Sequence, residues 1–190
     1  DGRNEKSRMI NSFIVGDIFK LIQDVPNNAV NLVEIDPPYA LELKRIKKTP
    51  KETMEGYTEI AAEDYRLFLL NLFTECYRVM FPDSWLLCWF GIQWYELVLE
   101  TMKSSGLSTC HIPAIWCKES SGQTNKPELR LGSAYEHFFY ARKGNATIRK
   151  PGRSNVFHFR MVQQDKKVHP TERRRGDHRQ PARDRDRRRI

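Results

Sequence analysis

The sequence is poor in the residues that cross-link small folds. Its 190 residues include four cysteines, none spaced as a Cys-x-x-Cys pair, which is typical of reduced thiols in a cytoplasmic protein. Cys110, His111 and Cys117 form one cluster of metal-ligating side chains, but no second Cys/His pair has zinc-finger spacing. We therefore expect neither disulfides nor a metal site.

Long apolar runs are missing as well. The longest, residues 85–92, is far shorter than the roughly 20 residues of a membrane-spanning helix. No signal peptide precedes the predicted fold, so we expect an intracellular protein without a membrane partner. A Gly-x-Gly turn after a strand is also absent, which removes the usual glycine-rich backbone turn that holds a cofactor.

Positive charge is present but unevenly distributed. The net charge is +8, and residues 173–190 contain nine arginines against three aspartates, which leaves +2 for residues 1–172. We predict that this tail is disordered because it is almost free of apolar residues, and that residues 1–10 form a disordered lead-in. Residues 11–172 contain enough apolar residues for one core, and we expect one domain there.

The most informative stretch is residues 30–39. Its first half is apolar and rich in β-branched residues, which predicts a buried strand. The strand should end at Asp36, because Pro37 and Pro38 cannot donate hydrogen bonds to a sheet. In open α/β sheets ligands bind at the carboxyl ends of strands, so a carboxylate and the ring of Tyr39 are expected at a binding edge.

Asp36-Pro37-Pro38-Tyr39 after an apolar strand resembles the catalytic motif of the DNA amino-methyltransferases. These enzymes transfer a methyl group from S-adenosylmethionine to the exocyclic amine of adenine (N6) or cytosine (N4). The resemblance implies an α/β fold, the Rossmann-like sheet of class I methyltransferases, with the four motif residues as the catalytic set. It implies DNA as the partner, and a restriction-system partner in some members. A motif that begins with Asp is more typical of N6-adenine enzymes, so adenine is the expected target.

The implied mechanism follows from the chemistry of an aromatic amine, whose lone pair is delocalised into the ring. Hydrogen bonds to the Asp36 carboxylate and the Pro37 carbonyl would localise that pair and direct it at the methyl group. Tyr39 would stack on the base. The base would have to leave the duplex to enter such a pocket.

A second carboxylate is expected near the first. Residues 12–15 predict a strand that leads through Gly16-Asp17 into a short helix from Ile18, and the next strand then completes a βαβ unit. Parallel strands in such a unit would bring Asp17 and Asp36 to one edge. By resemblance, Asp17 and Ile18 bind the adenosine part of the cofactor together with Asp36. Asp17 as a simple helix cap is an equally open interpretation.

The remaining pattern alternates strands and helices, as in a doubly wound α/β sheet. Residues 63–80 and 93–104 have helical periodicity, residues 81–83 predict a break, and residues 85–90, 108–118 and 137–141 predict strands, the last two as a reversed pair. Two basic segments, residues 40–57 and 145–164, are predicted as irregular loops. Each is open to two interpretations, contact with DNA or an ordinary solvated loop.

The segment Lys167–Glu172 resembles a second signature of the family, with His169 and Thr171 as further cofactor-binding residues. In the family a helix, an apolar strand and a glycine-rich turn should follow. Instead the arginine-rich tail begins at residue 173, so the expected sheet is incomplete and lacks its glycine-rich first βα unit. We interpret the change after Glu172 as a shifted reading frame or a truncation, which the coding DNA read in the other two frames would test.

Three functional hypotheses stay open at this point. The first is methylation of adenine N6 in DNA, with cytosine N4 as the variant within the same family. The second is methylation of another planar amine or amide, in RNA or protein, although related enzymes of that kind place the glycine turn ahead of the Pro-Pro-Tyr motif. The third is a non-catalytic remnant or a DNA-binding subunit that lacks its cofactor half.

Overall fold

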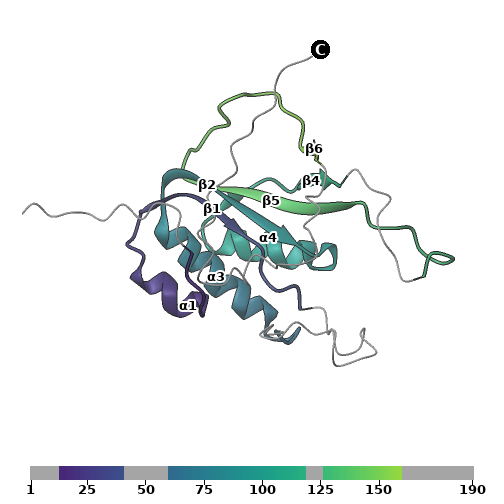
Figure 1. Cartoon of the computed structure of the whole chain (residues 1–190). Coiled ribbons are helices and arrows are strands. Elements are labelled where there is room, and N and C mark those ends of the chain that lie inside the picture. Colours follow the sequence, from purple (N-terminus) through teal and green to yellow (C-terminus); the bar gives the residue numbers. More distant parts are fainter. Residues whose placement is uncertain (1–12, 41–59, 119–125, 160–190) are drawn as a thin grey trace, which may run out of the picture. The chain divides into compact units, whose positions relative to one another are not determined.

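The computed structural model describes residues 13–40, 60–118 and 126–159, and every structural statement concerns these ranges (Figure 1). In chain order the elements are α1 (Ile18–Leu21), the 3-10 helix η1 (Ile22–Asp24), β1 (Val30–Ile35), α3 (Tyr65–Val79), β2 (Met80–Phe90), the 3-10 helix η3 (Ile92–Trp94), α4 (Tyr95–Ser104), β3 (Ser108–Thr109), β4 (Ala114–Cys117), β5 (Tyr135–Lys143) and β6 (Val156–His158). The predicted lead-in, most of the basic segment 40–57, His169, Thr171 and the arginine-rich tail lie outside the described residues.

The strands form one mixed sheet in the order β1-β2-β5-β4-β6, and β3 also pairs with β5. β1 is parallel to β2, β4 is parallel to β6, and β5 is antiparallel to both β2 and β4. The predicted α/β sheet with a reversed strand is therefore confirmed. Because β5 alone runs against these neighbours, its amino end lies beside the carboxyl ends of β1, β2, β4 and β6. We call this side of the sheet the carboxyl edge.

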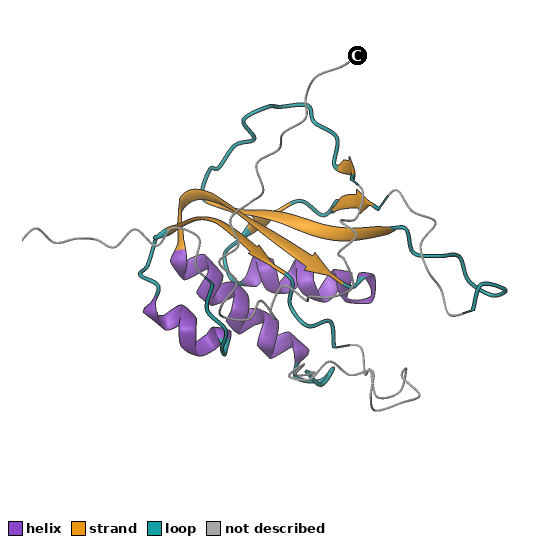
Figure 2. Cartoon of the chain, viewed as in Figure 1, coloured by secondary structure: helices purple, strands orange, loops and turns teal. Residues whose placement is uncertain are grey.

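The described helices cover one face of the sheet, as Figure 2 shows. The predicted helix at residues 63–80 is confirmed as α3, and its apolar stripe packs against alternate residues of β2, including Leu86 and Cys88. Its buried side chains and those of α4 form one core with β2 and β5. The fully buried members include Tyr65, Leu69, Phe73, Val98, Met102, Leu86 and Phe139. Burial raises the pKa of the Cys76 thiol to about 12, which keeps that core cysteine in its neutral form.

The opposite face of the sheet carries half-buried aromatic side chains. Trp89 lies 4.7 Å from Phe138 between ring centroids, and Trp85 lies 6.3 Å from Tyr140. These residues alternate with the buried residues of β2 and β5, as the period of two in a strand requires. Helices of the described residues lie on one face only, so the predicted double winding is not seen within these ranges.

The strand predicted at residues 12–15 is not found in the part of that segment that the structure describes. Residues 13–15 form no strand, and their side chains are strongly exposed, from 68% for Ile14 to 80% for Val15. An apolar triplet becomes a strand only where a neighbouring strand accepts its backbone hydrogen bonds. β1 pairs within the described residues with β2 alone, so no βαβ unit precedes it.

Three smaller predictions also need correction. Residues 81–83 do not break the chain but belong to β2, where a register shift opposite Val30–Leu32 accommodates Pro82. The strand predicted at residues 108–118 is divided into β3 and β4, both of which pair with β5. The segment predicted as irregular, 145–164, contains β6, because its residues 156–158 find a parallel partner in β4.

One arginine holds the amino-terminal segment onto the helical layer. The Arg78 guanidinium donates to the carbonyls of Ile22 and Val25, at 2.8 and 2.9 Å, and to the Asn27 side chain at 2.8 Å. Its Nε donates to Glu75 at 2.9 Å. The planar fork of an arginine suits such a multidentate contact. Arg78 on α3 thereby positions η1 and the turn that leads into β1.

Candidate active site

The Pro-Pro-Tyr motif lies at the carboxyl edge, as predicted. β1 ends at Ile35, and Asp36 is the first residue beyond it, with an exposed side chain. Pro37 is buried and Pro38 is half-buried, so the diproline step is packed against the protein while the carboxylate faces solvent. A strand thus delivers an exposed carboxylate to the edge where α/β sheets bind their ligands.

Asp36 and Tyr39 are brought into direct contact. The Tyr39 hydroxyl donates a hydrogen bond of 2.7 Å to Oδ1 of Asp36. Burial, and then this hydrogen bond, raise the pKa of the Tyr39 hydroxyl far above its ordinary value of 10.0. The phenol therefore stays protonated at neutral pH and acts as a donor. Its ring is held beside the carboxylate.

The backbone after the diproline is held by an aromatic anchor. Nε1 of Trp94 donates a hydrogen bond of 2.6 Å to the carbonyl of Tyr39. The next residue, Ala40, has a positive φ of 49° and is only 5% exposed. This left-handed conformation is unfavourable for a residue with a Cβ atom, so packing and the Trp94 hydrogen bond must maintain it.

The helical periodicity of residues 93–104 does not predict this contact of Trp94. Trp94 belongs to η3, which follows the carboxyl end of β2 after Gly91, and so it reaches the same edge as the end of β1. The nearest signal in the sequence is a tryptophan shortly after the end of the neighbouring strand. That signal predicts a contact with Tyr39 only when β1 and β2 are known to be adjacent and parallel.

Two acceptors remain for a ligand next to the diproline. Asp36 has one described partner, Tyr39, and a carboxylate can accept about four hydrogen bonds. No described residue donates a hydrogen bond to the Pro37 carbonyl. A carboxylate and a carbonyl one residue apart form an arrangement that can hold a planar group with two N–H donors. The geometry therefore suits an amide or an aromatic amine.

Asp17 caps a helix in the described residues. Its Oδ1 accepts a hydrogen bond of 2.9 Å from the backbone N–H of Phe19 and caps α1. The capping interpretation is thereby confirmed, although the second carboxylate oxygen of Asp17 has no described partner. Ile18 is 46% exposed. No hydrogen bond between described residues joins Asp17 to Asp36.

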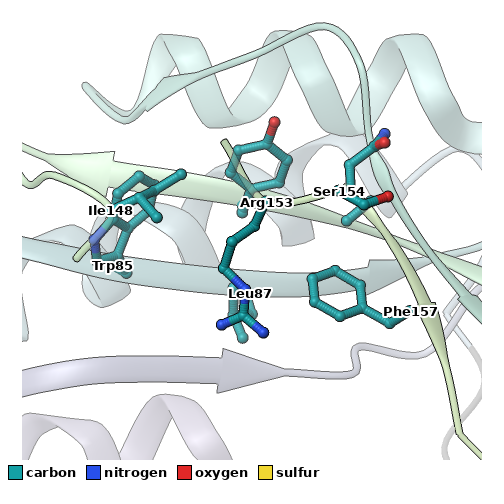
Figure 3. Close-up of a pocket in the computed structure, with 9 residues that line it drawn as sticks. Trp85, Leu87, Ile148, Arg153, Ser154 and Phe157 are labelled. Carbon is teal, nitrogen blue, oxygen red and sulfur yellow. The ribbon is translucent and has the colours of Figure 1, made fainter. Parts of the chain in front are cut away.

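A cavity of about 240 Å³ opens on the aromatic face of the sheet (Figure 3). It lies between the side chains of β2 and β5 and the segment that leads into β6, and Arg153 reaches across it. The residues shown and labelled at this cavity are Trp85, Leu87, Ile148, Arg153, Ser154 and Phe157. The ring centroids of Phe157 and Phe138 are 5.9 Å apart, so the Phe157 ring packs on the aromatic face of the sheet and is not free to stack on a base.

The described ranges contain neither a membrane-spanning helix nor a cluster of metal-ligating side chains. None of the helices there is long and apolar enough to cross a membrane. Between residues 13 and 159, gaps excepted, no group of three His, Cys, Asp or Glu side chains could hold a metal ion. Cys110 is exposed and Cys117 is half-buried, and both are free thiols.

Solved structures of DNA methyltransferases share this fold. The PvuII DNA methyltransferase (cytosine-N4-specific) aligns with a TM-score of 0.57 and 15% identity, over 80% of this chain and 58% of that one. A complex of M1.HpyAVI with SAM aligns with a TM-score of 0.54 and 14% identity, over 84% of this chain and 68% of that one. At these identities the likeness establishes the class I methyltransferase fold. The chain spans about three fifths to two thirds of the length of these proteins.

The sequence itself gives the family. No curated protein matches the sequence. A family model described as "DNA methylase", for N6 and N4 methyltransferases, matches residues 30–189, which is most of the chain and includes the Pro-Pro-Tyr motif at the end of β1. The chain belongs to the N6/N4 DNA methylase family.

Proposed function

We propose that this chain holds the target base in a DNA amino-methyltransferase, with adenine N6 as the methylated atom. The observation that carries the proposal is the anchored motif at the carboxyl edge, in which Tyr39 holds the Asp36 side chain and Trp94 holds the Tyr39 carbonyl. A fixed acceptor pair of this kind matches the two N–H donors of an exocyclic amine. DNA is the proposed partner because the family methylates DNA.

The chemistry depends on how the two acceptors change the amine. An aromatic amine is a weak nucleophile because its lone pair is shared with the ring. The Asp36 carboxylate and the Pro37 carbonyl accept its two N–H groups and draw electron density back onto nitrogen. Methyl transfer would break the S–C bond of S-adenosylmethionine as the N–C bond forms and leave a neutral thioether, and the proton that the amine loses would pass to Asp36 or to water. Positioning supplies most of the rate gain, with a hydrogen bond to a charged acceptor contributing about 1.5–3 kcal/mol.

S-adenosylmethionine supplies an electrophilic methyl group when it is bound. The described residues fit it in part. Asp17 offers one uncommitted carboxylate oxygen for the adenine amino group, and the exposed Ile18 offers an apolar contact. We propose these two residues, with Asp36, as the adenosine side, and His169 and Thr171 by resemblance. For the methionine end the chain contains no Gly-x-Gly turn.

A second candidate function is a DNA-binding protein without methyl transfer. The observation that favours it is that residues 1–190 contain no Gly-x-Gly turn. The two candidates differ in one measurable property. Isothermal titration of the chain with S-adenosylmethionine yields binding heat for a methyltransferase and none for the second candidate. A cognate nuclease stays a prediction from the resemblance, and a cytoplasmic location stays a prediction from the cysteine spacing.

The direct test is methyl transfer from radiolabelled S-adenosylmethionine to genomic DNA, with identification of the methylated nucleoside by mass spectrometry. N6-methyladenine is expected, and Asp36→Ala should lower the rate by about ten- to a hundredfold, because it removes the charged acceptor. Asp24→Ala is the matched control, since Asp24 is exposed on η1 and its side chain makes no hydrogen bond to a described residue. Equal rates for the two variants would contradict the role of Asp36.

A further inference from the structure

Exposed apolar side chains gather at the carboxyl edge. Two of them, Leu129 and Leu131, lie on the connection between β4 and β5 and are 72% and 98% exposed. Three others lie at the ends of neighbouring strands at this edge: Ile92, Tyr135 and Phe159. A leucine that is almost fully exposed gains nothing from folding. Its presence beside a binding edge indicates a surface that is covered when a ligand is bound.

Leu129 lies in a hydrogen-bonded turn, and Leu131 follows that turn. The backbone N–H groups of Leu129 and Arg130 both donate to the carbonyl of Lys126, each at 3.0 Å. Pro127 restricts the backbone at the start of this turn. Because these two hydrogen bonds already order the backbone up to Arg130, less conformational entropy is lost when the side chain of Leu129 enters a partner.

The connection extends from the same side of the sheet as the candidate active site. It leaves β4 after Cys117 and returns at Tyr135, which pair with each other. These residues lie at the carboxyl edge, as does Asp36 after β1. Figure 1 shows the described part of the connection projecting past the end of β5. A partner whose reacting group is held by Asp36 therefore lies on the side where Leu129 and Leu131 project.

The charges of the turn are compatible with a polyanion. Arg130 is exposed between the two leucines, and Lys126 and Arg130 outnumber the single carboxylate of Glu128. A nearby cation, Lys118, directly follows β4 and is paired with Glu136. An arginine flanked by leucines is a combination that contacts a phosphate while apolar side chains enter the base stack.

We propose that the turn of residues 126–131 is a wedge that enters the DNA duplex when the target base is flipped out. Leu131 occupies the space that the base leaves, Leu129 supports it, and Arg130 contacts a backbone phosphate. The inference rests on the proposed function, since flipping is needed only if a base is methylated. Filling the gap offsets part of the unstacking cost of a few kcal/mol.

The test uses one duplex of fixed sequence in two forms, fully paired and with a single abasic site, and measures binding by fluorescence anisotropy. At an abasic site no base has to be unstacked before Leu131 enters the duplex. The wild-type chain should therefore bind the abasic duplex more tightly than the paired duplex. Burying one leucine corresponds to a preference on the order of tenfold. Leu131→Ser should remove this preference and leave the affinity for the paired duplex unchanged, whereas Leu131→Phe should keep it.

Ile112→Ser is the matched control. Ile112 is 51% exposed and precedes β4, so it lies at the opposite edge of the sheet, and its variant should keep the preference. A preference that survives Leu131→Ser would overturn the wedge while leaving the proposed function intact. A wild-type chain that binds neither duplex would overturn both. If Leu131→Ser instead dissociates a dimer of the chain, the leucines form a contact between copies and the wedge is wrong.

Discussion

Replacing Trp94 by Phe should loosen the turn that carries the candidate catalytic residues. The change removes the indole N–H that donates to the Tyr39 carbonyl at 2.6 Å. It also weakens the edge-to-face contact of the indole with Tyr65, whose ring centroids are 5.1 Å apart. Because Ala40 is held at a positive φ immediately after this contact, the local backbone should relax toward a more favourable conformation.

The magnitude can be worked from these two contacts. A hydrogen bond of this type contributes about 1 kcal/mol net, and an aromatic pair about 0.5–1.5 kcal/mol, of which Phe keeps a part. The free energy of unfolding should therefore fall by about 1.5 kcal/mol. That loss is a noticeable fraction of the 5–15 kcal/mol typical of a domain. Urea denaturation followed by circular dichroism measures it.

Hydrogen exchange distinguishes a loosened turn from general destabilisation. The peptide that spans residues 36–40 should exchange faster in Trp94→Phe than in the wild type. Trp85→Phe is the matched control, because Trp85 is a half-buried tryptophan on the opposite face of the sheet with no described contact to this turn. If both variants leave exchange at residues 36–40 unchanged, Trp94 does not anchor the motif and the reasoning is refuted.

Two further predictions concern stability. Lys143 donates to the Asn28 side chain and to the carbonyls of Tyr77 and Met80, at 2.7, 2.8 and 2.9 Å, so Lys143→Met should lower the free energy of unfolding in urea by about 2 kcal/mol; a change below about 0.5 kcal/mol would contradict this. Burial lowers the pKa of His137 below 6.5, so the folded state binds fewer protons than the unfolded state and stability falls as the pH drops through that value. His137→Gln should reduce the loss of stability between about pH 7.5 and pH 5.5, and an unchanged loss would assign it to other groups.

The local residue pattern correctly predicted the elements that depend only on neighbouring residues in the chain. The apolar run ended by Pro37 and Pro38 predicted the end of β1, because a residue without a backbone N–H cannot continue a strand. The three- and four-residue spacing predicted α3, because a helix repeats every 3.6 residues. The adjacency of Asp36 and Tyr39 followed in part from their separation of three residues. These predictions needed no knowledge of the neighbouring strands.

The errors in predicting strands arose where pairing with a distant strand decides whether a segment becomes a strand. Residues 13–15 have a strand pattern but form no strand, and residues 156–158 form β6 although no pattern identified it. The difference is the neighbour, since β6 pairs with β4 while residues 13–15 have no partner in the described sheet. Hydrogen bonds between distant segments cannot be read from local spacing.

The sequence alone determined that a carboxylate, two prolines and a tyrosine follow an apolar strand, and through the family model it determined the family. The strand was predicted to be buried, but β1 lies at the end of the strand order and none of its residues is buried. Only the tertiary structure decided what holds that motif and what lies beside it. Trp94 reaches Tyr39, and the turn with Leu131 leaves the same edge as Asp36, because β1, β2 and β4 are parallel and β5 is reversed. Those relations depend on how strands far apart in the chain pair through their backbones, and every residue except proline offers the same backbone groups for pairing.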